Sequence, residues 1–406
     1  MRLTENWKQF WLLVLINAFV GAMIGLERSV LPGLAASEFH INGKTAVLSF
    51  IIAFGATKAL FNLVTRCLMK RYSRKAVLIL GWLAALPVPF LLMYAPAWTW
   101  ILLANVLLGI NQGLAWSTTV IMKIDLIGEK NRGLAMGINE FAGYLSVGLA
   151  AYLAAYLGGA AGSRVLSFAP GALFAVAGLV LSLLFVKDTG VLVHAEGLSS
   201  PIPRLRNIWK ETTYKHSNLG SVTLNGLVNN LNDGITWGLL PFLLLQKGYT
   251  TGQVGILAGI YPAVWGIGQL LTGRLGDRFC KKQLIILGMW VQAIALALVA
   301  FQSSFTADVI LVSMLGLGTA LVYPNFLTTV AENLHPAQRA EGLAIFRFWR
   351  DAGYVIGALL AGVIADAFGI GAAFGAVSAI TAGAGLVAQV RMCCSRKLLW
   401  TSVICP

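Results

Sequence analysis

The chain has 406 residues, of which 58% are hydrophobic and only 11% are charged, and its formal net charge is +14. Soluble domains carry roughly 25% charged residues, so this composition excludes an ordinary water-soluble protein. The mean hydropathy of +0.77 indicates instead a chain that lies largely within a membrane.

Apolar segments recur along the whole chain, and each is close to the length of about 20 residues that a helix needs to cross a bilayer. We count twelve, at roughly 10–32, 45–66, 76–95, 99–122, 133–157, 167–187, 218–246, 252–273, 283–303, 307–331, 342–366 and 370–391. The first is too long for a cleavable signal peptide and is expected to be retained. The sequence therefore predicts an all-α polytopic membrane protein with twelve transmembrane helices.

The positive charges predict the orientation. With the N-terminus in the cytoplasm, most of the 30 Lys and Arg residues fall in the terminal tails and in the even-numbered links between segments. Such a bias is typical of cytoplasmic loops, so we expect both termini in the cytoplasm. Because the bases are scattered among links, the net charge reflects topology, and no nucleic-acid partner is expected. All five cysteines also fall on this side, where reduced thiols are expected.

The chain divides by composition into four parts. We predict a six-helix bundle at 1–187, a polar cytoplasmic linker at 188–217 with a short amphipathic helix near 204–215, a second six-helix bundle at 218–391, and a cytoplasmic tail at 392–406. Two prolines, Pro87 and Pro89, are expected to kink the segment 76–95.

In chain order, polar residues inside the predicted segments are the candidates for a substrate and proton pathway, because ionisable groups are costly in a bilayer. They are Lys58, Asn111, Gln112, Glu140, Asn229, Asp233, Trp237, Arg347, Arg350 and Asp351. Glu27 and Arg28 form a further charged pair near the outer end of the first segment. The alternative is that these groups only pair with one another or hydrogen-bond between helices.

Among these residues, Asp233 is the first candidate for a proton or substrate site, since it lies amid asparagines and near Trp237. Asn111, Gln112 and Asn229 are candidate hydrogen-bond partners of a solute. Arg347 and Asp351, spaced i, i+4, share a helix face and can pair. Glu140 and Arg350 occupy nearly equivalent places in the two halves and are expected to face each other.

A charged motif repeats in the two halves. Residues 273–282 read GRLGDRFCKK, and residues 66–75, which lie 207 positions earlier, read RCLMKRYSRK. The same offset aligns Arg278 with Arg71 and Glu332 with Asp125, whereas the acid Asp277 aligns with Lys70. Two halves of equal orientation predict pseudo-symmetric bundles with a solute site at their interface.

The chain resembles the major facilitator superfamily over essentially its full length. The resemblance rests on the twelve segments, the basic linker and GRLGDRFCKK, which matches the superfamily hinge G-x-L-x-D-R-x-G-R-R except that Cys280 replaces the second glycine. It implies a cytoplasmic gate in which Asp277, after Gly273, faces the start of the helix near Gly133.

The same resemblance implies ion pairs between Arg278 and Glu332 and between Arg71 and Asp125. Two departures weaken a drug-antiporter interpretation. Asn105 stands where drug antiporters of the superfamily carry an Arg, and the segment 133–157 lacks their proline.

We expect a secondary active transporter of a small polar or amphipathic solute, working by alternating access and coupled to protons, as a monomer in a bacterial inner membrane. Export is slightly favoured over import, only because of how the superfamily's members divide. One alternative is an anion importer or exchanger with Lys58, Arg347 and Arg350 as the clamp. Another is a membrane receptor or assembly factor that transports nothing.

No catalytic activity, metal or cofactor is expected. The four histidines lie outside the predicted segments and lack metal-ligand spacing, and the chain has no phosphate-binding loop.

Overall fold

A computed structural model describes residues 3–28, 30–31, 34–35, 38–41, 44–127, 132–161, 163–190, 192, 202–394 and 397–399. The named secondary structure of this part is helical, and one isolated bridge joins Phe279 to Lys397.

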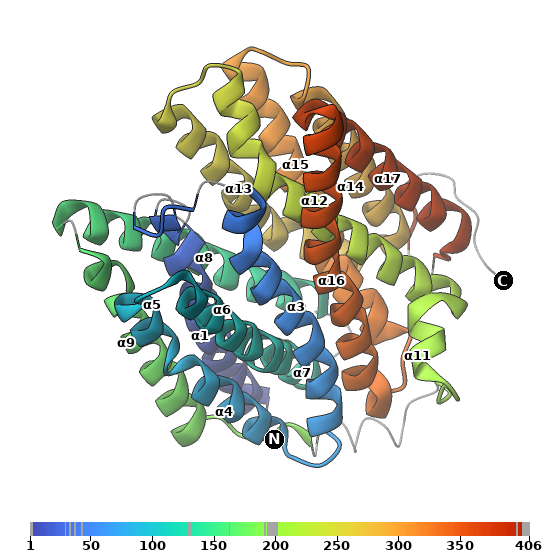
Figure 1. Cartoon of the computed structure of the whole chain (residues 1–406). Helices are drawn as coiled ribbons and strands as arrows, with labels where there is room; N and C mark the ends of the chain where they lie inside the picture. The colour runs from blue at the N-terminus through green and yellow to red at the C-terminus, as the bar shows by residue number, and fades with distance from the viewer. Residues whose placement is uncertain are drawn as a thin grey trace. The chain divides into compact units, whose positions relative to one another are not determined.

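Figure 1 shows these helices in the colours of the chain. In the first half they are α1 Leu3–Arg28, α3 Lys44–Leu68, α4 Arg74–Ala85, α5 Val88–Tyr94, α6 Trp98–Asn111, the π-helical turn η1 Gln112–Trp116, α7 Ser117–Leu126, α8 Arg132–Ala161 and α9 Arg164–Leu184. In the second half they are α11 Ile208–Lys210, η3 Glu211–Lys215, α12 Ser217–Gln246, α13 Thr251–Arg278, α14 Lys281–Val299, α15 Phe305–Glu332, α16 Pro336–Phe368 and α17 Ile370–Arg391.

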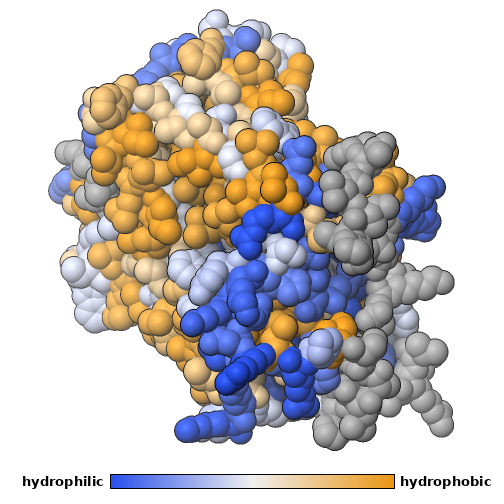
Figure 2. Space-filling model, turned by 90° about the vertical axis from the view of Figure 1, so that its right-hand side faces the viewer, coloured by the Kyte–Doolittle hydropathy of each residue, from blue (hydrophilic) through white to orange (hydrophobic). Residues whose placement is uncertain are grey.

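Each predicted segment corresponds to helix in the described residues, with the breaks noted below. Eleven helical spans in this part are long and apolar enough to cross a membrane. The helix α12 is not among them because asparagines and Asp233 lower its hydropathy. Large apolar side chains are exposed on the helices, such as Val363 at 68% and Val390 at 82%. Figure 2 shows apolar residues covering much of one face, with hydrophilic residues gathered in one region of it.

Proline and a π-helical turn interrupt two of the segments. The predicted kink is confirmed, because α4 ends at Ala85 and α5 begins at Val88, with Pro87 between them. In the next segment α6, η1 and α7 follow without a gap, so that one π-helical turn sits in the middle of a long helix. Such turns are rare and occur often at functional sites. The π-helical turn η1 begins at Gln112, which the sequence indicates as a candidate residue of the substrate and proton pathway.

The glycines of the charged motif do not form a turn. The helix α13 starts with a capping box between Thr250 and Gln253 and continues through Gly273 to Arg278. Only Phe279 and Cys280 separate it from α14. A Cβ on Gly273 would collide with the backbone oxygen of Gly133, and a Cβ on Gly133 would collide with that of Gly273. The glycine therefore allows two helices to approach closely.

The chain forms two compact units, unit 1 of 1–128 and 142–199 and unit 2 of 129–141 and 200–406. In unit 1, α3 packs on α6 and α1 on α9, whereas in unit 2 α12 packs on α16 and α14 on both α15 and α17. The change from unit 1 to unit 2 near residue 200 falls within the predicted linker. The start of α8 groups with unit 2, which the predicted division at 187 did not anticipate. The short helix expected near 204–215 corresponds to α11 and η3.

The prediction of reduced thiols is wrong for most of the described cysteines. Cys280 and Cys394 form a disulfide, and Cys393 is also disulfide-bonded. Cys67 is exposed and has a free thiol. Cys405 lies outside the described residues. The sequence could not show this, since 114 positions separate Cys280 from Cys394.

Candidate functional site: a helix-end gate and a buried ionic cluster

The carboxylate of Asp277, at the end of α13, accepts hydrogen bonds from the first turn of α8. Its two oxygens lie 2.7 Å from the backbone nitrogen of Gly133 and 2.9 Å from that of Leu134. These nitrogens are at a helix N-terminus, where the backbone has unsatisfied donors and a partial positive charge. This contact is the one expected from the sequence, and the close approach of Gly133 and Gly273 makes it possible.

The two predicted ion pairs of the gate have different partners. Lys281 lies 2.9 Å from Glu332, and Arg74 lies 2.7 Å from Asp125. The predicted partners are Arg278, the last residue of α13, and Arg71, in the link after α3; both are exposed and form neither pair. The prediction was wrong because each acid meets the base that begins the helix after the charged motif, Lys281 of α14 or Arg74 of α4, and not the arginine three residues earlier.

Asp233 lies at the centre of a buried cluster in unit 2. Tyr261 of α13 donates a short hydrogen bond to Asp233, and Tyr354 of α16 donates another at 3.4 Å. The guanidinium of Arg350 lies 4.0 Å from the same carboxylate. Trp237, one turn further along α12, packs edge-on against the Tyr261 ring at 6.0 Å. The acid is thus held by two hydroxyl groups and one base.

Arg350 joins three polar groups of this cluster. Its guanidinium lies 3.3 Å from the carboxylate of Asp351 and stacks 3.9 Å above the ring of Tyr323. Asp351 also accepts a hydrogen bond from Asn230 at 3.2 Å. The expected pair of Arg347 with Asp351 stays a prediction.

A second guanidinium approaches Glu140, which lies eight residues after the first residue of α8. Arg347 donates to the hydroxyl of Tyr323 at 3.0 Å and lies 3.9 Å from Glu140. Asn139 donates to the same carboxylate at 2.5 Å. Arg347 is therefore a base beside Glu140, whereas the sequence suggested Arg350 for this place. The acids and bases of this cluster are at most 3% exposed: Asp233, Asp351, Glu140, Arg347 and Arg350.

Two buried amides in unit 2 have unused hydrogen-bonding capacity. Neither side-chain polar atom of Asn229, one turn before Asp233 on α12, has a hydrogen-bond partner in the described structure, and the same holds for Gln269 on α13. Both side chains are fully buried. Buried amides without partners are rare, so these groups are candidates to bind a solute or water.

From the sequence we predicted Asn229 as a site residue, but not Gln269 or the tyrosines Tyr261, Tyr323 and Tyr354. The dipeptide Tyr-Pro, at 261–262 and 323–324, was a signal that could have drawn attention to two of them.

In unit 1 the candidate residues have local partners. Lys58 lies over the rings of Phe54 and Trp116, at 5.7 and 5.8 Å. Asn111 donates to the Gly81 carbonyl at 3.0 Å, and Gln112 to the Val20 carbonyl at 2.8 Å. These amide groups act as bonds between helices, which is the alternative that the sequence left open.

The charged pair near the end of α1 is divided between two environments. Glu27 is 1% exposed. Arg28 lies 5.6 Å above the Phe54 ring. No group of three potential metal ligands occurs among the residues that were described.

Long apolar helices, a carboxylate at a helix end and buried ionic groups together define a polytopic membrane protein of the transporter class. The model of the Major Facilitator Superfamily matches residues 10–215 and 222–397. The chain belongs to this superfamily, whose members are membrane transporters and not enzymes.

Three proteins illustrate its similarities. The inner membrane transport protein YnfM of Escherichia coli is 26% identical over 149 residues, which are 37% of this chain and only 36% of YnfM. The proton-coupled antiporter flippase LtaA of Staphylococcus saprophyticus is 24% identical over 317 residues, 75% of this chain and 74% of LtaA. The crystal structure of the human organic anion transporter MFSD10 has a TM-score of 0.78 and 16% identity, covering 95% and 99% of the two chains. At that identity the likeness shows the fold alone.

Proposed function

We propose that this protein is a secondary active transporter that moves a small polar or amphipathic solute by alternating access, coupled to protons. It acts in a bacterial inner membrane with both termini in the cytoplasm, and export is the favoured direction. The observation that carries the proposal is the buried contact of Asp233 with Tyr261, Tyr354 and Arg350.

The charges of this cluster favour proton coupling. The contacts in unit 2 bring the carboxylates of Asp233, Asp351 and Glu140 together with the guanidinium groups of Arg347 and Arg350. An unbalanced charge in a low-dielectric interior is costly, and binding a proton removes that cost. Asp233 is the proton site in this proposal, because its main partners are neutral hydroxyls that can bond either form of the acid. The relative LtaA carries the name of a proton-coupled antiporter.

The solute would bind next to this acid. Asn229 lies one helical turn from Asp233 and has both polar atoms of its amide available. Trp237 and Tyr261 supply an aromatic surface on the other side of Asp233 along α12. An amide, an aromatic surface and one titrating carboxylate suit a solute with polar and apolar parts. Gln269 supplies a second amide further along α13.

Anion transport by a basic clamp has less support. Arg350 contacts Asp233 and Asp351, and Arg347 lies near Glu140, so both guanidinium groups already face acids. Lys58 is covered by aromatic rings. An anion would have to replace these partners. A receptor without transport would need no titrating acid in this position.

The experiment is solute-driven proton flux in proteoliposomes that contain a pH-sensitive dye. Solutes are first chosen by the thermal stabilisation that they give the purified protein, since a bound ligand raises apparent stability. We expect proton movement that depends on the solute in the wild type and its loss in Asp233→Asn. The matched control Asp308→Asn changes a buried acid outside the cluster and should retain coupling if the protein folds. Coupled flux that persists in Asp233→Asn would refute the assignment of the proton site. Absence of flux with every stabilising solute would favour the receptor.

A further inference from the structure

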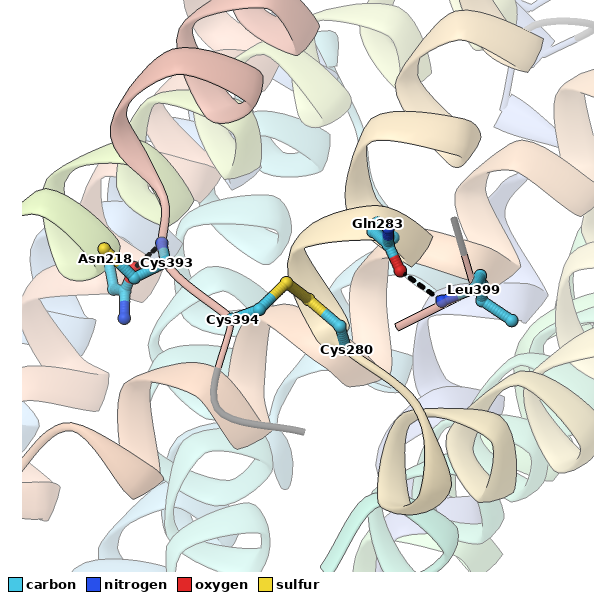
Figure 3. The surroundings of a disulfide bond; sticks show 6 residues. All are labelled: Asn218, Cys280, Gln283, Cys393, Cys394 and Leu399. Atoms are coloured by element: carbon cyan, nitrogen blue, oxygen red, sulfur yellow. Dashed lines mark hydrogen bonds between the residues drawn. A yellow bond between two sulfur atoms is a disulfide. The ribbon is translucent and has the colours of Figure 1, made fainter. Parts of the chain in front are cut away.

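The chain after α17 turns back along unit 2 and is held there at several points. We call its described residues, 392–394 and 397–399, the strap. Cys394 forms the disulfide with Cys280, with 5.5 Å between their Cα atoms. The backbone nitrogen of Cys280 donates to the carbonyl of Lys397 at 2.8 Å, and that of Leu399 to the Gln283 side chain at 2.5 Å. Figure 3 shows the disulfide and, beside it, the contact of Leu399 with Gln283.

The strap also reaches the first turn of α12. The backbone nitrogen of Cys393 donates to the side chain of Asn218 at 2.8 Å, as Figure 3 shows. The same Asn218 donates to Asn333 at 3.1 Å, directly after α15. The strap thereby connects the end of α17 with the beginning of α12, the end of α15 and the link between α13 and α14.

The disulfide is attached at the centre of the gate. Cys280 directly precedes Lys281, which pairs with Glu332. It lies three residues after Asp277, the acid that accepts hydrogen bonds from the start of α8. A covalent bond at Cys280 therefore restrains the segment whose contacts must change when the gate opens. Cys280 is 1% exposed and Cys394 is 9% exposed, so the bond is largely shielded and Cys394 is the more exposed of its two residues.

Two unusual features of the sequence meet in this bond. Cys280 replaces the second glycine of the hinge, and Cys394 belongs to a tail unlike the rest of the chain in composition. A hinge cysteine whose disulfide partner lies 114 positions away indicates a feature particular to this chain, and not a part of the gate that the superfamily shares.

We propose that Cys280 and Cys394 are a redox site that regulates the gate: the disulfide holds the α13–α14 link, and its reduction releases the strap and speeds the conformational cycle. This regulation rests on the proposed function and on the cytoplasmic position of the tail. Disulfides are rare in the cytoplasm, and those that do form there are usually transient or redox-sensing.

The reaction is thiol–disulfide exchange with a dithiol reductant. A thiolate of the reductant attacks the sulfur of Cys394, the S–S bond breaks, and the Cys280 thiolate leaves and takes up a proton. The second thiol of the reductant then displaces Cys394, whose sulfur is also protonated. Two electrons and two protons pass to the protein, and the reductant ends as a disulfide.

Peptide mapping tests whether the bond exists. Trypsin cleaves on both sides of residues 279–281 and of residues 392–396. The oxidised protein should yield these two peptides joined, with any peptide bonded to Cys393 also attached, and the reduced protein should yield them apart. Cys393→Ser, which keeps both partners, should still give the joined product. Failure to find the joined peptides after mild oxidation of the purified full-length protein would overturn the proposal.

Deuterium exchange tests the mechanical effect without any transported solute. Amides of the segment 273–283 should exchange about tenfold faster after dithiothreitol treatment, because release of the strap lowers the cost of local opening. Cys67→Ser should respond like the wild type, whereas Cys280→Gly, which restores the hinge glycine, should exchange rapidly under both conditions. Equal exchange in the oxidised and reduced wild type would refute the restraint.

Transport then separates this inference from the proposed function. With the amphipathic cation ethidium as the probe, the reduced protein should transport about tenfold faster than the oxidised protein, and Cys280→Gly should show no such difference. An exchange response with equal, measurable ethidium flux in both forms would overturn the regulation. An exchange response with no flux of ethidium or of any stabilising solute would count against the proposed function and leave the redox-controlled strap supported.

Discussion

Lys281, the first residue of α14, lies 2.9 Å from Glu332, the last residue of α15. Arg74, the first residue of α4, has the same relationship to Asp125 near the end of α7, at 2.7 Å. Both members of the second pair lie 207 positions before their counterparts. Each unit thus contains the same ion pair. It joins the first residue of one helix to the end of a later helix, α14 to α15 in unit 2 and α4 to α7 in unit 1.

This repeated pair predicts a measurable coupling. In a double-mutant cycle with Lys281→Met and Glu332→Gln, we expect an interaction energy of about 1 kcal/mol, because the pair is only partly shielded from water. Thermal unfolding of the purified protein gives the four stabilities. Arg278→Met with Glu332→Gln is the matched control and should show no coupling. A coupling to Arg278 as large as that to Lys281 would contradict the assigned partner.

The helix-end contact of Asp277 predicts an asymmetric gate. Asp277→Asn removes the charge that faces the first turn of α8 and should destabilise the contact by about 1 kcal/mol. Lys70→Asn changes the aligned position in the first half, which has no acid to lose. Accessibility labelling of single cysteines at either membrane face should therefore show a larger shift of the inward–outward balance for Asp277→Asn. Equal shifts in both variants would show that the missing acid has no consequence.

The helices and the Asp277 contact could be predicted because they depend on local or repeated signals. The length of the apolar stretches predicts the helical segments, and Pro87 predicts the break between α4 and α5. The charged motif before Cys280 predicts that Asp277 faces the end of another helix. The partners of Glu332 and Asp125 could not be predicted in the same way. A shift of three residues within a charged motif changes which base points toward an acid, and the sequence does not show where α13 ends.

The buried cluster was predictable in its members but not in all its pairs. Asp233, Arg350 and Glu140 were recognised because charge is costly in a membrane. Their tyrosine partners were missed, since a tyrosine in an apolar segment resembles ordinary core. The disulfide of Cys280 forms because the tail folds back along unit 2, and the periodicity of the sequence does not predict where a tail folds.

The link between α12 and α13 offers a test of a buried ion pair. Lys247 lies 2.8 Å from Asp308, whose carboxylate also accepts a 2.8 Å hydrogen bond from Tyr249. Burial, and then the bond and charge of Asp308, raise the pKa of Tyr249 to about 12, so its hydroxyl keeps the proton that it donates. Asp308→Ala should destabilise the protein by about 3 kcal/mol, since it leaves Lys247 without this buried partner.

An exposed pair provides the control for this change. Glu38 lies 2.6 Å from Arg164, but its side chain is 42% exposed. We expect Glu38→Ala to lower the melting temperature far less than Asp308→Ala, because water screens the exposed charges. Similar losses in the two variants would mean that burial does not decide the strength of the Asp308 pair.

His216 predicts a dependence of stability on pH. It precedes α12, and its Nδ1 accepts a hydrogen bond from the backbone nitrogen of Leu219 at 3.4 Å. Burial lowers the pKa of His216 below its ordinary 6.5, although the nearby Glu211 opposes the shift. The neutral ring is the acceptor, so its contribution to stability is complete above the ordinary pKa and is lost as the pH falls through the lowered one.

We therefore expect the melting temperature of the wild type to fall more between pH 7 and pH 5 than that of His216→Asn. Asparagine can cap α12 in the same way but does not titrate. His194→Asn changes a histidine in the predicted linker and should retain the dependence of the wild type. Parallel melting curves for the wild type and His216→Asn across this range would show that protonation of His216 does not weaken the start of α12.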